Sequence, residues 1–251
     1  MLKAPIKSRQ VKSLVQLHRQ VESCDRCARL RSYCQDVARE KRRAFLEWDY
    51  WGKPVSGFGD PLARIWIIGL APAAHGANRT GRVFTGDRSG DFLFAALHRT
   101  GLANQPDSVR KDDGLELRNV YISATARCAP PGNKPLPQEV ENCGGYLDAE
   151  WRLLKRKRVI LALGKIAWDA CLGLTKRQGL RLAKPQAAFG HGATLRLSDS
   201  LTLVGSFHVS QQNTFTGKLT ERMFDDVLRQ CLEHADCAIT APRKPAQSLG
   251  R

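Results

Sequence analysis

The segment Arg64-Ile65-Trp66-Ile67-Ile68-Gly69 is a short, apolar, β-rich run that indicates a buried strand. Similar apolar runs recur at residues 120–123, 158–164 and 201–205, and segments with helical character lie at residues 91–99, 137–154, 165–174 and 220–232. This alternation predicts an α/β fold with three layers, in which helices cover both faces of a central, mainly parallel four-stranded sheet.

The same pattern predicts the domain organisation. We expect a helical lead over residues 1–22, a single domain over residues 23–234 and a flexible tail over residues 235–251. Residues 194–197 are a candidate hairpin partner for the last strand. Ligands of such sheets bind where loops leave the carboxyl ends of the strands, so the chemistry is expected in the loops after Gly69, Ser123 and Gly205.

The composition narrows the class of partner. The 251 residues carry 40 Lys and Arg against 24 Asp and Glu, a formal net charge of +16. Such an excess favours a nucleic-acid partner, because each neutralised phosphate releases counterions. The alternative is a basic protein that its charge keeps soluble. No apolar run approaches the about 18–20 residues of a membrane span, and no secretory signal follows the basic N-terminus, so we expect a cytoplasmic location.

Residues 28–46 form a strongly basic run for which the sequence predicts a helix. Two interpretations are equally supported. The cations either form a solvated helix face or face DNA.

Eight cysteines suggest a metal or cluster site rather than disulfides, because thiols stay reduced in the cytosol. Cys24 and Cys27 form a C-x2-C pair, and Cys128 and Cys143 follow about 100 residues later. Four thiolates from two chain segments can bind zinc or an iron–sulfur cluster, which visible absorption distinguishes. Such a site would anchor the N-terminal helix to the core. The remaining cysteines show no comparable pairing: Cys34, Cys171, Cys231 and Cys237.

The long loop over residues 69–87 carries the most informative sequence. It is neither a dinucleotide-binding fingerprint nor a phosphate-cradling loop, which argues against nucleotide hydrolysis and dinucleotide chemistry. Its glycines allow a ligand to approach the backbone closely. Phe84 offers a stacking face, and Asp87 is the only carboxylate of the loop.

This loop resembles the first motif of the family-5, or type B, uracil-DNA glycosylases of the iron–sulfur type. Residues 127–135 are similar to the second motif of that family, residues 207–217 to the third, and residues 54–60 to its lead-in. The resemblance extends from about Cys24 to Leu232. It implies the uracil-DNA glycosylase fold and a 4Fe–4S cluster bound by Cys24, Cys27, Cys128 and Cys143.

The resemblance also implies a reaction. The substrate is DNA that contains uracil or another deaminated base such as hypoxanthine, and the protein acts as a monomer that leaves an abasic site. A base inside a duplex cannot be reached, so the nucleotide must flip out. Breaking the glycosidic bond then leaves positive charge on the sugar and negative charge on the departing base.

Three residues are predicted to be catalytic. Asp87 stabilises the sugar cation or orients water, unless it only caps the following helix. His208 donates to the uracil oxygen or contacts a phosphate. Asn133 hydrogen-bonds the flipped nucleotide, unless it is only a turn residue.

Four further residues are predicted to bind the substrate. Phe84 stacks on the base, with core packing as the alternative, and the backbone N–H of Ala71 donates to the base. Ser210 and Asn213 hold backbone phosphates or a wedge loop. Other glycosylases carry a polar group at the position of Ala71, and its absence here increases the importance of Asp87.

Two other classes of protein remain as alternatives. A non-catalytic zinc or iron–sulfur module that binds nucleic acid would need the charge and the cysteines but neither Asp87 nor His208. An electron-transfer protein would need a second redox site, which the sequence does not show.

Overall fold

The computed structural model describes residues 10–182 and 187–237. Within these residues, one sheet has the strand order β1-β3-β2-β4-β6-β5. Its strands are β1 (Phe58–Gly59), β2 (Ile65–Gly69), β3 (Val120–Ala124), β4 (Val159–Leu163), β5 (Thr194–Ser198) and β6 (Leu201–Ser206). β3, β2, β4 and β6 run parallel to one another, and β1 and β5 pair antiparallel at the two edges.

The predicted fold class is confirmed, including the hairpin of β5 with β6. The sheet has six strands rather than four because two antiparallel edge strands extend the parallel core. β1 is only two residues long and lies in a stretch rich in Gly and Pro, so no alternating pattern marks it. Most of the tail predicted at residues 235–251 lies outside the described residues.

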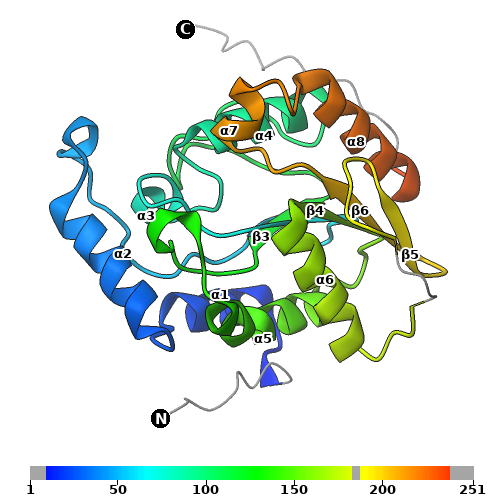
Figure 1. Ribbon diagram of the computed structural model, residues 1–251, viewed down its shortest axis with the longest axis horizontal. Helices are drawn as coiled ribbons and strands as arrows, with labels where there is room; N and C mark the ends of the chain where they lie inside the picture. The colour runs from blue at the N-terminus through cyan, green and yellow to red at the C-terminus, as the bar shows by residue number, and fades with distance from the viewer. Residues whose placement is uncertain (1–9, 183–186, 238–251) are drawn as a thin grey trace, which may run out of the picture.

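Helices cover both faces of the sheet (Figure 1). α4 and α8 lie on one face, and α1, α5 and α6 lie on the other. No helix in the described part of the chain is long and apolar enough to cross a membrane. The helices are α1 (Leu14–Glu22), α2 (Ala28–Glu40), η2 (Arg43–Phe45), α3 (Ala77–Thr80), α4 (Arg88–Arg99), η3 (Pro131–Asn133), α5 (Pro137–Leu153), α6 (Lys165–Arg177), α7 (Gln211–Phe215) and α8 (Glu221–His234).

The side chains of β2 alternate between two cores, because successive residues of a strand point to opposite faces. Ile65 and Ile67 pack in the cluster that includes Leu93 of α4 and Phe224 of α8. Trp66 and Ile68 pack in the second cluster, with Trp168 of α6 and Leu147 of α5. β2 is buried along its whole length, which explains its continuous apolar sequence.

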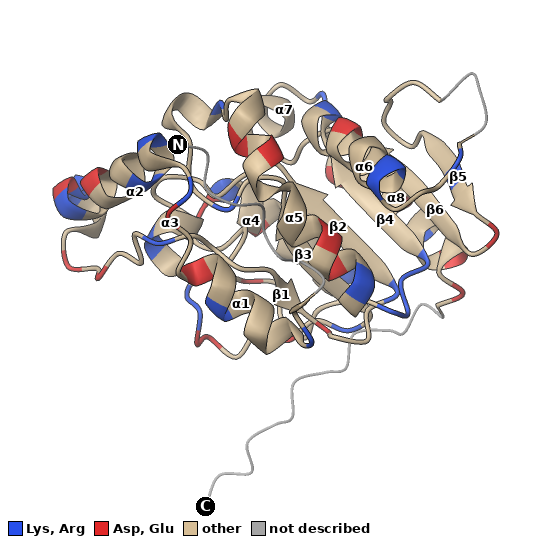
Figure 2. Ribbon diagram, turned by 90° about the horizontal axis from the view of Figure 1, so that it is seen from below, with Lys and Arg blue, Asp and Glu red and all other residues tan. Residues whose placement is uncertain are grey.

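The basic run at residues 28–46 is not one helix. α2 ends at Glu40, because Lys41 adopts φ +54°, and the short turn η2 follows. Several of its cations bind protein groups: Arg29 pairs with Glu139, Arg31 donates to the carbonyl of Gly52, and Arg39 pairs with Asp36. Residues of both charge signs lie side by side at the outer end of α2 (Figure 2).

Candidate active site

A cavity of about 730 Å³ is built by residues from the loops that the sequence singles out. Asp87 comes from the loop after β2, Asn133 from the loop after β3, and Gln211 from the segment after β6. The parallel order of these strands brings their carboxyl ends to one edge of the sheet. These three loops therefore meet at one cavity.

Asp87 both caps a helix and faces the cavity. Its Oδ1 accepts hydrogen bonds from the backbone N–H groups of Ser89 (2.9 Å) and Gly90 (3.1 Å) at the start of α4. In the described residues no hydrogen bond reaches Oδ2. This oxygen lies beside Gly76, so close that a Cβ added to Gly76 would be 2.0 Å from it. One oxygen therefore holds the side chain in place and the other is free for a ligand.

Burial raises the pKa of Asp87, while the two N–H groups and the nearby charge of Arg79 oppose this rise. The carboxylate is thus poorly solvated but surrounded by compensating positive groups. Such a group interacts strongly with a cation that forms beside it, because little water screens the interaction.

His208 is the second predicted catalytic residue, and burial lowers its pKa to about 4. The imidazole is therefore neutral at neutral pH and carries one N–H donor. No hydrogen bond in the described residues uses its ring nitrogens. Its ring lies against that of Phe84, with 6.3 Å between the centroids and 36° between the planes.

Phe84 packs in the main core, and its ring contacts Gly69. A Cβ added to Gly69 would lie 2.5 Å from this ring. Core packing is therefore one role of Phe84, and stacking on a base stays a prediction. Ala71 lies two residues after Gly69 and is half-buried, and no hydrogen bond among the described residues engages its N–H.

Asn133 ends the turn η3 with φ +57° and is exposed at the cavity. Its backbone N–H donates to Pro130, and its side-chain amide makes no hydrogen bond within the described residues. Asn213 differs, because its Nδ2 donates to the carbonyl of His208 (2.8 Å). Ser210 is the N-cap residue of α7 but makes no side-chain cap bond. The amide of Asn213 is thus already used to hold the backbone at His208.

The cavity wall also contains residues that the sequence reasoning missed. Arg42 and Phe45 come from the segment after α2, and His75 and Arg79 come from the loop after β2. Two arginines at residues 42 and 43 are followed by aromatic residues at 45, 48, 50 and 51, and this was the available signal.

The four predicted cysteine ligands gather near the start of α2, whose N-cap residue is Cys27. Their thiols are free, and those of Cys24 and Cys128 act electrostatically on both Cys27 and Cys143. Nδ2 of Asn142 donates to the sulfur of Cys27 at 3.3 Å. Within the described residues, no three metal-ligating side chains are as close as one metal ion requires.

Cys34 also belongs to this region, although the sequence showed no partner for it. It is fully buried and packs in one cluster with Leu30 and Cys128. The signal was its spacing of two helical turns from Cys27, which puts both on one face of α2.

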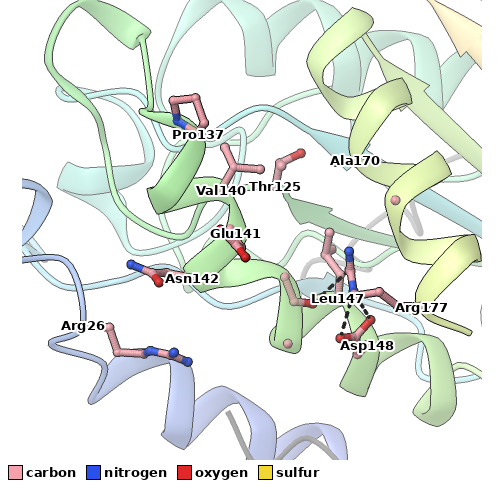
Figure 3. Close-up of a pocket in the computed structure, with 13 residues that line it drawn as sticks. Arg26, Thr125, Pro137, Val140, Glu141, Asn142, Leu147, Asp148, Ala170 and Arg177 are labelled. Carbon is pink, nitrogen blue, oxygen red and sulfur yellow. Dashed lines mark hydrogen bonds and ion pairs between the residues drawn. The ribbon is translucent and has the colours of Figure 1, made fainter. Parts of the chain in front are cut away.

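Another cavity, of about 370 Å³, lies between α5 and α6 (Figure 3). Arg26 lines one side of it, and the ion pair of Arg177 with Asp148 (3.0 Å) lines the other. No residue predicted to bind substrate lines this cavity. It therefore does not compete with the cavity at Asp87 as the candidate active site.

Several known proteins are similar to this chain in sequence. The family model described as "Uracil DNA glycosylase superfamily" matches residues 56–232 of this chain. The type-5 uracil-DNA glycosylase of Mycobacterium bovis is 51% identical over 219 residues, which cover 87% of this chain and 80% of that protein. The type-5 enzyme of Thermus thermophilus is 49% identical over 208 residues, covering 83% and 92%. A type-4 uracil-DNA glycosylase of Pyrobaculum aerophilum is 32% identical over 170 residues, covering 67% and 69%.

The chain therefore belongs to the uracil-DNA glycosylase superfamily. Its layered α/β fold and the cavity at Asp87 are consistent with this class. Within that superfamily it belongs to the type-5 uracil-DNA glycosylases.

Proposed function

We propose that this protein excises uracil from DNA by hydrolysing the N-glycosidic bond of a flipped nucleotide, which leaves an abasic site. The observation that carries this proposal is the free Oδ2 of Asp87 in a cavity formed by all three family motifs. The substrate is DNA in the cytoplasm, and the protein acts on it as a monomer.

Asp87 stabilises the developing sugar cation through Oδ2 and orients the attacking water. Its Oδ1 cannot do this, because it holds the N-terminus of α4. The cap prevents the carboxylate from rotating away, so the charge is in place before the bond breaks. Such preorganised electrostatic stabilisation is commonly the largest part of catalysis.

His208 donates its N–H to the uracil oxygen on which negative charge develops. Its low pKa means that the donor is a neutral imidazole. Asn133 and the backbone N–H of Ala71 hold the flipped base, and Ser210 contacts the backbone phosphates.

A duplex with a single uracil tests this function. Purified protein should convert it to an alkali-labile abasic site and leave the matched thymine duplex intact. A hypoxanthine duplex tests whether the pocket accepts a deaminated purine. If the uracil duplex is bound but never cleaved after alkali, the protein is a binding module and not an enzyme.

We expect Gly76→Ala to lower the excision rate by roughly 10²-fold, because its Cβ would lie 2.0 Å from Oδ2 of Asp87 and must displace it. Single-turnover kinetics measure the effect. Gly190→Ala is the matched control, because its Cβ meets only Ala193 at an ordinary 3.6 Å. A Gly76→Ala enzyme with the wild-type rate would show that Oδ2 does not act in the cavity.

The four cysteines are proposed to hold a 4Fe–4S cluster. A single zinc ion needs all four sulfurs about 2.3 Å from one centre, whereas each cysteine of a cluster binds its own iron. Four cysteine thiols are a donor set that an iron–sulfur cluster takes. Buried donors that lack a partner point the same way, because sulfide and thiolate accept hydrogen bonds: Nε of Arg26, and Nε and Nη1 of Arg127.

Burial raises the pKa of Cys143 to about 12, so this thiol ionises only when bound cations compensate its charge. When bound, the cluster supplies a crosslink between the N-terminal helices and the core. Arg127 also forms a buried ion pair with Glu150 at 2.6 Å, which fixes the backbone beside Cys128.

A further inference from the structure

Arg79 makes a set of contacts that the reaction described above does not use. Its side chain is buried, with Nε donating to the carbonyl of His75 and Nη2 to that of Gly86, both at 2.8 Å. Gly86 directly precedes Asp87, and His75 directly precedes Gly76, which faces Oδ2. One guanidinium therefore joins the two parts of the loop that enclose the carboxylate.

Aromatic rings cover this guanidinium. The carbon at its centre lies 3.8 Å from the ring centroid of Phe45 and 4.0 Å from that of Trp48. Both rings come from the segment that follows α2. A planar guanidinium stacks on aromatic faces while its edge donates hydrogen bonds, which an ammonium cannot do.

The segment that carries these rings is itself fixed. The N–H of Gly52 donates to the carbonyl of Asn78 (3.0 Å), and the carbonyl of Gly52 accepts from Arg31 of α2 (3.1 Å). Nδ2 of Asn78 donates to the carbonyl of Cys34 (3.2 Å). The catalytic loop thus rests on α2, which begins beside Cys27.

We propose that Arg79 is a positioning residue for base excision, which bridges the carbonyls of His75 and Gly86 against the rings of Phe45 and Trp48 and so holds Asp87 in the cavity. This proposal rests on the proposed function. A direct contact of Arg79 with phosphate does not explain the geometry, because two of its donors are already bonded to the loop and its side chain is only 4% exposed.

The charge of Arg79 supports this role. It opposes the effect of burial on the pKa of Asp87, whereas the nearby Asp91 adds to that effect. The other titratable or charged groups of the cavity wall are Tyr33, Arg42, His75 and Arg88. Burial lowers the pKa of His75, so at neutral pH it is uncharged. Removing the cation at position 79 therefore raises the pKa of Asp87 further.

Two substitutions separate geometry from charge. Arg79→Lys keeps the positive charge but loses the paired hydrogen bonds of the guanidinium and its contacts with the two rings. We expect its single-turnover rate to fall by about 30-fold with DNA affinity unchanged. Arg79→Met should lose more, and the acidic limb of its pH–rate profile should move to higher pH. Arg196→Met, which removes an exposed cation on the distant edge strand β5, is the matched control and should keep the wild-type rate.

Trp48→Leu covers the case in which the Arg79 variants fail to fold, because Trp48 is half-buried outside the two main cores. It removes one of the two rings that contact the guanidinium and leaves both hydrogen bonds of Arg79. We expect a rate about fivefold lower at an unchanged DNA affinity. A wild-type rate in Arg79→Lys, or in Trp48→Leu, would overturn the positioning role. An inactive wild-type protein would instead refute the proposed function itself.

Discussion

Asp87→Asn is expected to lower the single-turnover rate of uracil excision by roughly 10²–10³-fold, with DNA affinity within about threefold of the wild type. The asparagine oxygen still accepts the N–H groups of Ser89 and Gly90, because Asn is as good an N-cap as Asp. The change therefore removes the negative charge and leaves the helix in place. Quenched-flow excision and fluorescence anisotropy with a uracil duplex measure the two quantities.

The thermal stability of this variant gives an independent check. Because burial raises the pKa of Asp87, the folded protein binds a proton there more tightly than the unfolded chain. The ionised group therefore costs stability above its unfolded pKa, and Asp87→Asn should melt no lower than the wild type at pH 7. Asp87→Ala is the contrasting variant, since it also loses the cap, at a cost of about 1 kcal/mol.

The same pKa gives the enzyme a pH dependence. Excision needs the ionised carboxylate, so the rate should fall as the pH drops through the raised pKa of Asp87, above the usual range for aspartate. His208 adds no limb near its usual pKa of 6.5, because burial holds its pKa at about 4. Equal losses of rate and affinity in Asp87→Asn would make Asp87 a binding residue and contradict the mechanism.

Cys27→Ser should cost on the order of 4 kcal/mol of stability through loss of the bound cluster. For a chain of this size, that corresponds to a Tm lower by roughly 8–16 °C. Cys27 is the N-cap residue of α2, so its release also frees the helix on which the catalytic loop rests. We therefore expect slower excision together with the lower Tm.

Iron and sulfide content, visible absorption and calorimetry measure this effect. Cys237→Ser is the matched control, because its thiol is half-buried just after the end of α8 and donates to the carbonyl of Ala235, and Cys237 is not one of the four predicted ligands. It should keep the iron and melt within about 2 °C of the wild type. Stoichiometric zinc in place of iron in the wild type would disprove the cluster. Full iron content in Cys27→Ser would show that Cys27 is not a ligand of the cluster.

The sequence alone determined the layered fold and the place of the site. Apolar runs such as β2 are local patterns that burial on both faces imposes, and parallel strands must end at one edge, which brings Asp87 and Asn133 to one cavity. Only the tertiary structure decided how Asp87 divides its two oxygens between the helix cap and the cavity. It also decided that Arg79 lies against Phe45 and Trp48, because contacts between segments distant along the chain leave no periodic signal in the sequence.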